Sequence, residues 1–208
     1  MAIADGMSIS CSDLQAVGGT RLIAIRVVTS DDTVTFDDAT HGINVIKSST
    51  GTATEANWGV YESRIESSSL TITGSNEGKD NTAYECNVSW FIPGMTASQF
   101  LRLHQFEGDC LMVMVIDNND NTSGTTPSAA TYASNKVIGT SKRFNDLDNQ
   151  ARSQTYARVM SIEGGTGAAF SDEIGVTVTI GCTQYEIPRK YEGTIVLGST
   201  GKTLTTSA

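Results

Sequence analysis

The chain has 208 residues and carries 23 acidic against 14 basic side chains, which gives a formal net charge of −9 at pH 7. This length fits one β-rich domain, since such domains often reach about 200–250 residues. The charge argues against a DNA-wrapping protein, because no basic patch is available to release counterions. An acidic surface can still face DNA without holding it.

No segment resembles a targeting or membrane-spanning sequence. Residues 1–7 have neither a basic start nor an apolar run, and no segment approaches the roughly 18 apolar residues of a membrane span. We therefore expect a soluble protein made in a cytoplasm, without membrane insertion.

The first third of the chain contains short strand candidates. Residues 22–28 form a mostly apolar run, and residues 34–36 and 43–46 are shorter candidates. Residues 48–57 have the composition of an exposed loop. We expect a long loop over about residues 30–65.

Two hairpins are predicted further along the chain. In residues 84–90 every second side chain is apolar, which places one face of a strand in a core and the other in water. A similar strand over residues 70–73 precedes it, and the polar residues 74–81 join the two. Residues 157–163 and 174–182 repeat this pattern around a glycine-rich turn.

One short helix is predicted. Thr96 and Gln99 form a capping box, and Gly108 ends the helix. Between them lies an apolar stripe of Phe100, Leu103 and Phe106.

The remainder of the chain alternates one strong strand with polar segments. Residues 111–116 are continuously apolar, which favours a strand covered on both faces. A long loop is expected over residues 117–154. Residues 188–208 contain little core-forming material and are predicted to be a C-terminal arm that needs a partner, as residues 1–14 are at the N-terminus.

The four cysteines do not form a metal or redox motif. They are far apart, no CxxC occurs, and only two histidines could join them. Buried free thiols are the favoured interpretation, with a disulfide as the alternative. The residues are Cys11, Cys86, Cys110 and Cys182.

Two loop motifs are weak candidates for ligand sites. Residues 117–121 resemble the start of a calcium loop, but Thr122 replaces the turn glycine and Ser128 the final glutamate, so a solvated turn is favoured. Residues 164–167 are glycine-rich but lack the lysine of a phosphate-binding loop, which indicates a hairpin turn. We expect no cofactor and no metal.

Candidate catalytic residues are equally sparse. The pairs Asp31 with Asp32 and Asp37 with Asp38 could supply carboxylates, yet neighbours on a strand point to opposite faces. His104 could orient a nucleophile, but no nucleophile motif accompanies it. The sequence therefore does not predict an enzyme.

An ordered series over residues 68–187 carries a family resemblance. Leu70-Thr71-Ile72-Thr73-Gly74 leads through a charged turn to the run over residues 87–94, which ends in Trp90-Phe91-Ile92-Pro93-Gly94. The short helix, Glu107-Gly108-Asp109, the apolar strand and the second hairpin follow in that order. This series resembles the tail tube proteins of long-tailed bacteriophages, which are related in fold to the inner tubes of contractile injection systems.

The resemblance implies a mainly β fold, a tail-tube-like β-sandwich or barrel with one short helix, long loops and extended terminal arms over residues 1–208. It implies a body over residues 15–187 and a structural role in which six subunits close their sheets into a ring. Stacked rings would surround a lumen that conducts viral DNA during ejection. The implied partners are further copies of the chain, tape-measure and tail terminator or baseplate proteins, and passing double-stranded DNA. The implied location is the virion tail, assembled in the bacterial cytoplasm.

Alternation assigns the two faces of the strands. A wet face of small polar side chains can line a pore once strand edges are paired between neighbours. The side chains expected to face the lumen are Glu85, Asn87, Ser89, Ser161, Thr177 and Thr179. Those expected in the core are Leu70, Ile72, Cys86, Val88, Trp90, Phe100, Leu103, Phe106, Ile162, Val176, Val178 and Ile180.

A different class of function remains open. A virion decoration or receptor-binding β-sandwich would use its loops on a ligand instead of on copies of itself. Trp58, Tyr61 and Tyr132, which fall in expected loops, would then be candidate contacts.

Overall fold

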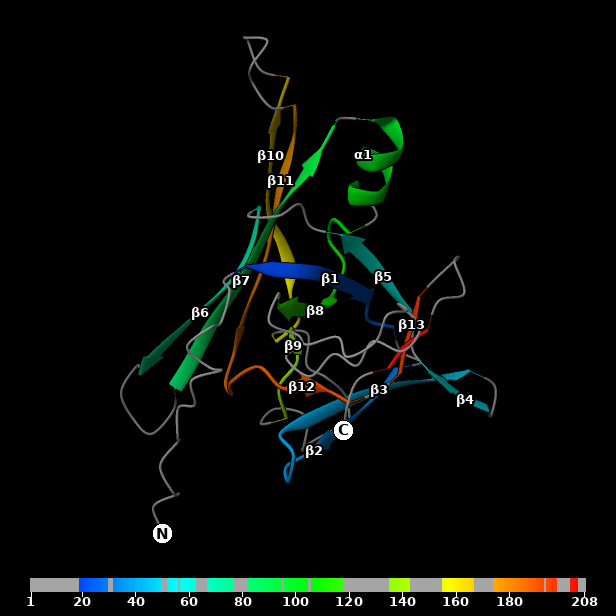
Figure 1. Cartoon of the computed structure of the whole chain (residues 1–208). Helices are drawn as coiled ribbons and strands as arrows, with labels where there is room; N and C mark the ends of the chain where they lie inside the picture. The colour runs from blue at the N-terminus through cyan, green and yellow to red at the C-terminus, as the bar shows by residue number, and fades with distance from the viewer. Residues whose placement is uncertain are drawn as a thin grey trace, which may run out of the picture.

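The computed structural model describes residues 19–29, 32–49, 52–55, 57–62, 67–76, 82–94, 96–104, 106–117, 135–142, 155–166, 174–192, 194–197 and 203–205. Over these residues the chain forms fourteen strands and one α-helix (Figure 1). The expected mainly β class is confirmed. Within the described residues no helix is both long enough and apolar enough to cross a membrane.

A six-stranded sheet lies in the middle of the molecule, in the order β14-β13-β5-β1-β8-β9. β8 is its most buried strand, because every side chain from Leu111 to Ile116 is at most 1% exposed. The expectation of an apolar strand covered on both faces is confirmed. The strand bounds are Thr203–Thr205, Thr194–Leu197, Asn57–Glu62, Thr20–Val27, Leu111–Asp117 and Asn135–Ile138.

A four-stranded antiparallel sheet, in the order β10-β11-β7-β6, packs on one face of the six-stranded sheet. β8 contributes Leu111, Val113 and Val115 to this contact, and they share a cluster with the inward side chains of β7 and β11. Both predicted hairpins are present, β6 with β7 and β10 with β11. The strand bounds are Arg158–Gly165, Gly175–Gln184, Thr82–Pro93 and Ser68–Asn76.

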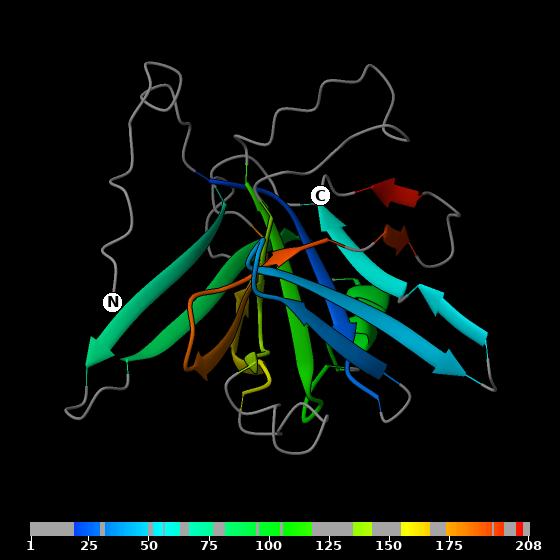
Figure 2. The same cartoon turned by 90° about the horizontal axis from the view of Figure 1, so that it is seen from below.

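A third sheet, in the order β12-β3-β2 with β4 added to β3, covers the opposite face of the six-stranded sheet. The alternate β8 residues Met112, Met114 and Ile116 point into this second cluster. Figure 2, seen from below, shows β2 and β3 crossing in front of the central strands. The strand bounds are Lys190–Tyr191, Gly42–Ser49, Asp32–Asp37 and Thr52–Glu55.

The predicted helix is α1, Ala97–His104. Phe100 N–H donates to the carbonyl of Thr96 at 3.2 Å, so Thr96 precedes the first turn as a cap does. Gly108 has a φ of 83°, a left-handed conformation that ends helices. Only part of the apolar stripe is covered: Leu103 is buried, whereas Phe100 is 42% exposed. The core assignment of Phe100 is wrong, because α1 lies at the end of the sandwich (Figure 1) and Leu103, not Phe100, joins the core cluster.

The long loop expected over residues 30–65 is wrong. Four strands, β2 to β5, occupy most of it. Trp58, expected to be a loop contact, is 1% exposed and meets Tyr191 edge-on, with ring centroids 5.3 Å apart. Tyr61 packs its ring on Trp90 and Phe106. Tyr132 lies outside the described residues.

The C-terminal arm expected over residues 188–208 is also corrected. Arg189 and Tyr191 are buried, and β12 pairs in parallel with β3. β13 pairs in parallel with β5. These contacts make the described part of the segment a component of the body. The predicted N-terminal arm, residues 1–14, lies outside the described residues. The second expected loop, residues 117–154, is wrong in part, because β9 (Asn135–Ile138) lies within it and pairs with β8. Residues 118–134 and 143–154 lie outside the described residues.

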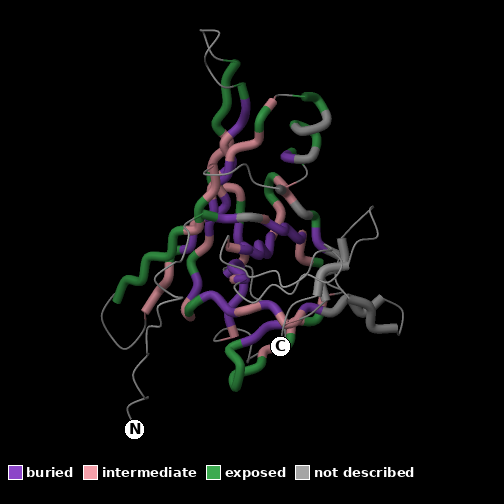
Figure 3. The backbone as a smooth tube through the Cα atoms, viewed as in Figure 1, coloured by how far each residue is buried: buried purple, intermediate pink, exposed green. Residues whose placement is uncertain are grey.

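Most of the other residues expected in the core are buried or partly buried. Figure 3 colours the buried parts of the backbone purple. Ile72 is the second exception, because it is 39% exposed. Ile72 lines a depression of about 270 Å³ beside Asp117 and Lys136, near the end of the edge strand β6. The confirmed buried residues are Cys86, Val88, Trp90, Leu103, Val176, Val178 and Ile180, and the partly buried ones packed against them are Leu70, Phe106 and Ile162.

Candidate functional site

The most distinctive surface is the face of the four-stranded sheet that points away from the core, termed the outer face here. Directly opposed residues on neighbouring antiparallel strands share a face. The registers therefore align its side chains in rows across the sheet. One row is Ser69, Ser89, Thr179 and Ser161, and the next is Thr71, Asn87, Gly181 and Arg158.

All six residues expected from alternation to face a lumen lie on this outer face. Ser89 and Thr179 are opposed, with the Thr179 hydroxyl 3.5 Å from that of Ser89. Asn87 Nδ2 donates to Glu85 Oε1 at 3.1 Å, and Glu85 is exposed. Thr177 opposes Phe91, and Ser161 opposes Thr179. The surface is thus composed mostly of hydroxyl and amide groups.

Sequence reasoning missed several members of the same face. The β6 hydroxyls of Ser69, Thr71 and Thr73 continue the rows to the sheet edge and are all exposed. Glu163 on β10 adds a second exposed acid, and Arg158 adds an exposed base. The alternation of β6 could have found the hydroxyls, because Leu70 and Ile72 had already been assigned to the opposite face.

A β-bulge explains why the alternation breaks in β10. The register of β10 against β11 shifts between Val159 and Ser161. Val159 and Ile162 both pack against the core, whereas Met160, between them, is 68% exposed. The extra residue of a bulge places two neighbouring side chains, Met160 and Ser161, on the outer face.

A depression of about 400 Å³ lies on the outer face where β10 begins. Gly181 lines it between Asn87 and Met160, which approach so closely that a Cβ at position 181 would stand 2.2 Å from Asn87 Oδ1 and 3.1 Å from Met160 Cγ. Arg158 and Tyr156 line one side. Burial, with the nearby Cys110 and Asp32, raises the pKa of Tyr156 to about 12, so its phenol stays protonated and able to donate.

The two edge strands of this sheet are offset along it. β6 pairs with residues 82–90 of β7. β10 pairs with the part of β11 that in turn pairs with residues 87–93 of β7. The β6–β7 end and the β10–β11 end therefore project past the body in opposite directions, as Figure 1 shows. Such a stagger is a requirement for closing a sheet into a barrel.

The hydrogen-bond pattern identifies which backbone groups of β6 face outward. Phe91 N–H donates to the carbonyl of Ser67 at 3.1 Å, which continues the ladder in which Ser68 opposes Trp90. In an antiparallel pair the bonded positions alternate. The odd-numbered residues of β6 thus bond to β7, and Leu70 and Ile72 turn their N–H and C=O groups toward the edge.

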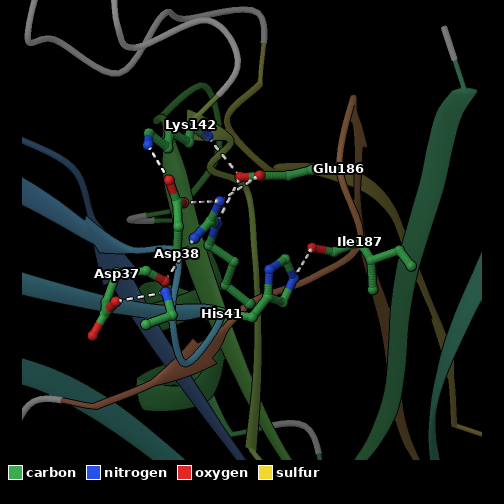
Figure 4. Close-up of polar contacts among 8 residues, drawn as sticks. Asp37, Asp38, His41, Lys142, Glu186 and Ile187 are labelled. Carbon is green, nitrogen blue, oxygen red and sulfur yellow. Dashed lines mark hydrogen bonds and ion pairs between the residues drawn. The ribbon is translucent and has the colours of Figure 1, made fainter. Parts of the chain in front are cut away.

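A second polar cluster comprises Arg189, Glu186, Asp38 and Lys142 and is termed the Arg189 cluster. Figure 4 labels its members Glu186, Asp38 and Lys142. Arg189 donates to Glu186 and, at 3.1 Å, to Asp38 Oδ1. The hydrogen bond from Lys142, together with Arg189, lowers the pKa of Asp38. These contacts join three segments of the chain. The cluster is buried on the Arg189 side, since the side chain of Arg189 is 6% exposed.

The remaining candidates are structural contacts. Asp32 pairs with Arg26, and Asp37 Oδ1 accepts from Ala39 N at 2.8 Å. Asp31 lies outside the described residues. His104 is 76% exposed and contacts Glu107, which agrees with a surface histidine. Among the described residues no three His, Cys, Asp or Glu side chains are grouped to hold a metal ion.

The predicted ligand loops are described only in part. Asp117, the first residue of the calcium-like segment, pairs with Lys136. Gly164 and Gly165 end β10, as expected for a hairpin.

Comparison of the chain with protein-family models, with curated proteins and with solved structures finds no match.

Proposed function

We propose that the protein is the structural subunit of a bacteriophage tail tube, in which six copies form a ring and stacked rings surround a lumen for viral DNA. The observation that carries the proposal is the four-stranded sheet, which combines a polar outer face with two strands at its edges, β6 and β10. In the assembled ring the outer face of this sheet is the lumen wall.

The strand directions support closure. β10, β11, β7 and β6 are successively antiparallel, so the two edge strands run in opposite directions. When copies are related by rotation, β6 of one copy lies beside β10 of the next, and the new pair is antiparallel as well. A ring of copies thus extends one ladder without a change in pattern, and closure removes the open edges.

The composition of the outer face supports passage of DNA. Serine, threonine and asparagine side chains predominate, and among the described residues of this face the exposed charges are the acids Glu85 and Glu163 and the base Arg158. Tight binding of DNA requires many cations that displace its counterions. A wall with so few cations lets a polyanion slide past it.

Native mass spectrometry of two variants at one position tests the edge pairing. Ile72→Pro removes an N–H that points to the open edge, where a sheet tolerates proline, and leaves the bonds from β6 to β7 intact. Ile72→Val keeps the N–H. We expect hexamers for the wild type and for Ile72→Val, and monomers with a retained β-rich circular dichroism spectrum for Ile72→Pro. Hexamers of undiminished stability in Ile72→Pro would refute this pairing.

A further inference from the structure

Two cysteines lie directly opposite each other in the centre of the four-stranded sheet. Cys86 on β7 and Cys182 on β11 are paired in an uninterrupted antiparallel register. Both side chains belong to the inner face, where Cys86 is buried and Cys182 packs against the same cluster. The structure holds both as free thiols.

Their separation suits a disulfide. Opposed residues of an antiparallel pair have Cα atoms about 4.5 or 5.5 Å apart, depending on the type of pair. Disulfides span Cα separations of about 4.4–6.8 Å. Because the two side chains leave opposed positions on the same face of the sheet, little movement is needed to join them.

Only one of the two cysteines borders a surface depression. Cys86 is 0% exposed. Cys182 lines the depression of about 400 Å³ beside Tyr156 and Arg158. β10 begins at Arg158, which opposes Gly181, so Cys182 lies just past the point where β10 covers β11. The depression therefore extends from the outer face to the part of the β11 edge that β10 does not cover, where it borders Cys182 and not Cys86.

We propose that Cys86 and Cys182 form a reversible cross-strand disulfide when a low-molecular-weight disulfide enters the depression. The thiolate of Cys182 attacks one sulfur of the oxidant, forms a mixed disulfide and releases one small thiol. The thiolate of Cys86 then attacks Cys182 Sγ, closes the protein disulfide and releases the second small thiol. Two protein thiols are oxidised, one small disulfide is reduced, and the protons of the two cysteines pass to the released thiols.

The surroundings of Cys182 set the pace of the first step. Its hydrogen bond to Cys86, followed by burial, raises the pKa of the Cys182 thiol. Because only the thiolate attacks, oxidation is slow near neutral pH and accelerates as the pH rises. In reducing surroundings the pair remains as two thiols.

The disulfide would tie together segments that are distant in sequence. A crosslink that closes a loop of about 100 residues restricts the unfolded chain strongly, and for a protein of this size the expected rise in thermal midpoint is on the order of 10 °C. The effect does not require a ring, because both cysteines belong to the same subunit.

The test uses the full chain with Cys11 and Cys110 replaced by serine, so that only the pair remains. Oxidised glutathione is the probe, and intact mass, peptide mapping and thermal melting are the readouts. We expect loss of two hydrogens, a mapped Cys86–Cys182 link, a raised midpoint and full reversal by dithiothreitol. In this background, Cys86→Ser should instead trap a glutathione adduct on Cys182, and Cys182→Ser should leave the native protein unmodified.

Two results would overturn the proposal. One is a glutathione adduct that persists on Cys182 while Cys86 is present, which would mean that the second thiol cannot reach it. The other is a pair that stays reduced in the native protein at pH 9 but links after unfolding in guanidinium. Both can be observed whether or not the protein assembles into rings.

Discussion

Arg189 donates to both carboxylate oxygens of Glu186, from Nε to Oε1 at 3.0 Å and from Nη2 to Oε2 at 2.8 Å. The guanidinium also lies over the ring of Phe36, 5.3 Å from its centroid, and donates to the carbonyl of Asp37 at 3.1 Å. Arg189 thereby connects the β2–β3 hairpin with the segment that follows β11.

Replacing Arg189 should destabilise the whole fold. Arg189→Ala removes the two hydrogen bonds that the guanidinium donates to the partly buried carboxylate of Glu186, and it removes the stacking on Phe36. We expect a loss of about 3 kcal/mol in the free energy of unfolding, typical of removing one partner of a buried pair. Urea unfolding measures it. Lys142→Ala, which removes a more exposed cation from the same cluster, should cost only a fraction of this, and an equal loss would contradict the assignment.

Tyr156 should titrate late. Its pKa in the folded protein, about 12, exceeds the ordinary value of 10. A raised pKa means that the protonated form favours folding, so this contribution is complete below pH 10 and is lost as the pH rises from 10 through 12. A titration followed by the ultraviolet absorbance of phenolate should show a tyrosine that ionises above the ordinary pH range, and Tyr156→Phe should remove this signal. Persistence of the high-pH phenolate signal in the variant would mean that another tyrosine is responsible.

Gly139 and Gly108 offer a matched pair for backbone strain. Both have positive φ angles, 90° and 83°. A Cβ on Gly139 would stand 2.5 Å from the carbonyl oxygen of Leu111, whereas one on Gly108 would meet nothing within 4 Å. Gly108→Ala should cost about 1 kcal/mol of left-handed strain, and Gly139→Ala clearly more because the backbone must also shift. Similar losses in urea unfolding would show that the close approach at Gly139 is absent.

A charge reversal on the outer face should make the proposed ring retain DNA. Glu85 is exposed, and Glu85→Lys would place six cations in one belt of a hexameric ring. DNA carries about one charge per 1.7 Å of its axis, so such a belt binds it in a salt-dependent way. We expect normal assembly, with DNA retention at low salt that added salt relieves.

The control for this variant is Glu107→Lys, which changes the same charge at an exposed position beyond α1. It should not retain DNA. Retention by both variants would locate the effect outside the lumen, and failure of Glu85→Lys to assemble would place Glu85 between subunits.

Alternation predicted the two-faced strands well. In the middle of β7 and β11 every second side chain is a buried apolar residue, because these strands lie in the middle of a sheet with one covered face. Local pattern is sufficient there. It failed at Ile72 and Phe100, since a pattern identifies the apolar side of an element but not how far its neighbours extend over that side.

The extent of strand structure over β2 to β5 was missed for a different reason. Only the short candidates at residues 34–36 and 43–46 were recognised, and two of these strands pair with partners distant in sequence, β3 with β12 and β5 with β13. The burial of Trp58 against Tyr191 likewise joins the first third of the chain to its end. A local pattern does not reveal a partner that lies more than a hundred residues away. The bulge at Met160 also breaks the period of two, which concealed one member of the outer face.

Electron microscopy of the purified, assembled protein tests the central claim most directly. The account predicts six-fold rings or stacked tubes with a hollow centre, whose wall is the four-stranded sheet with Ser89, Thr179 and Ser161 facing the lumen. Compact monomers or trimers at every concentration would contradict it, as would a ring in which this row of side chains lies on the outside.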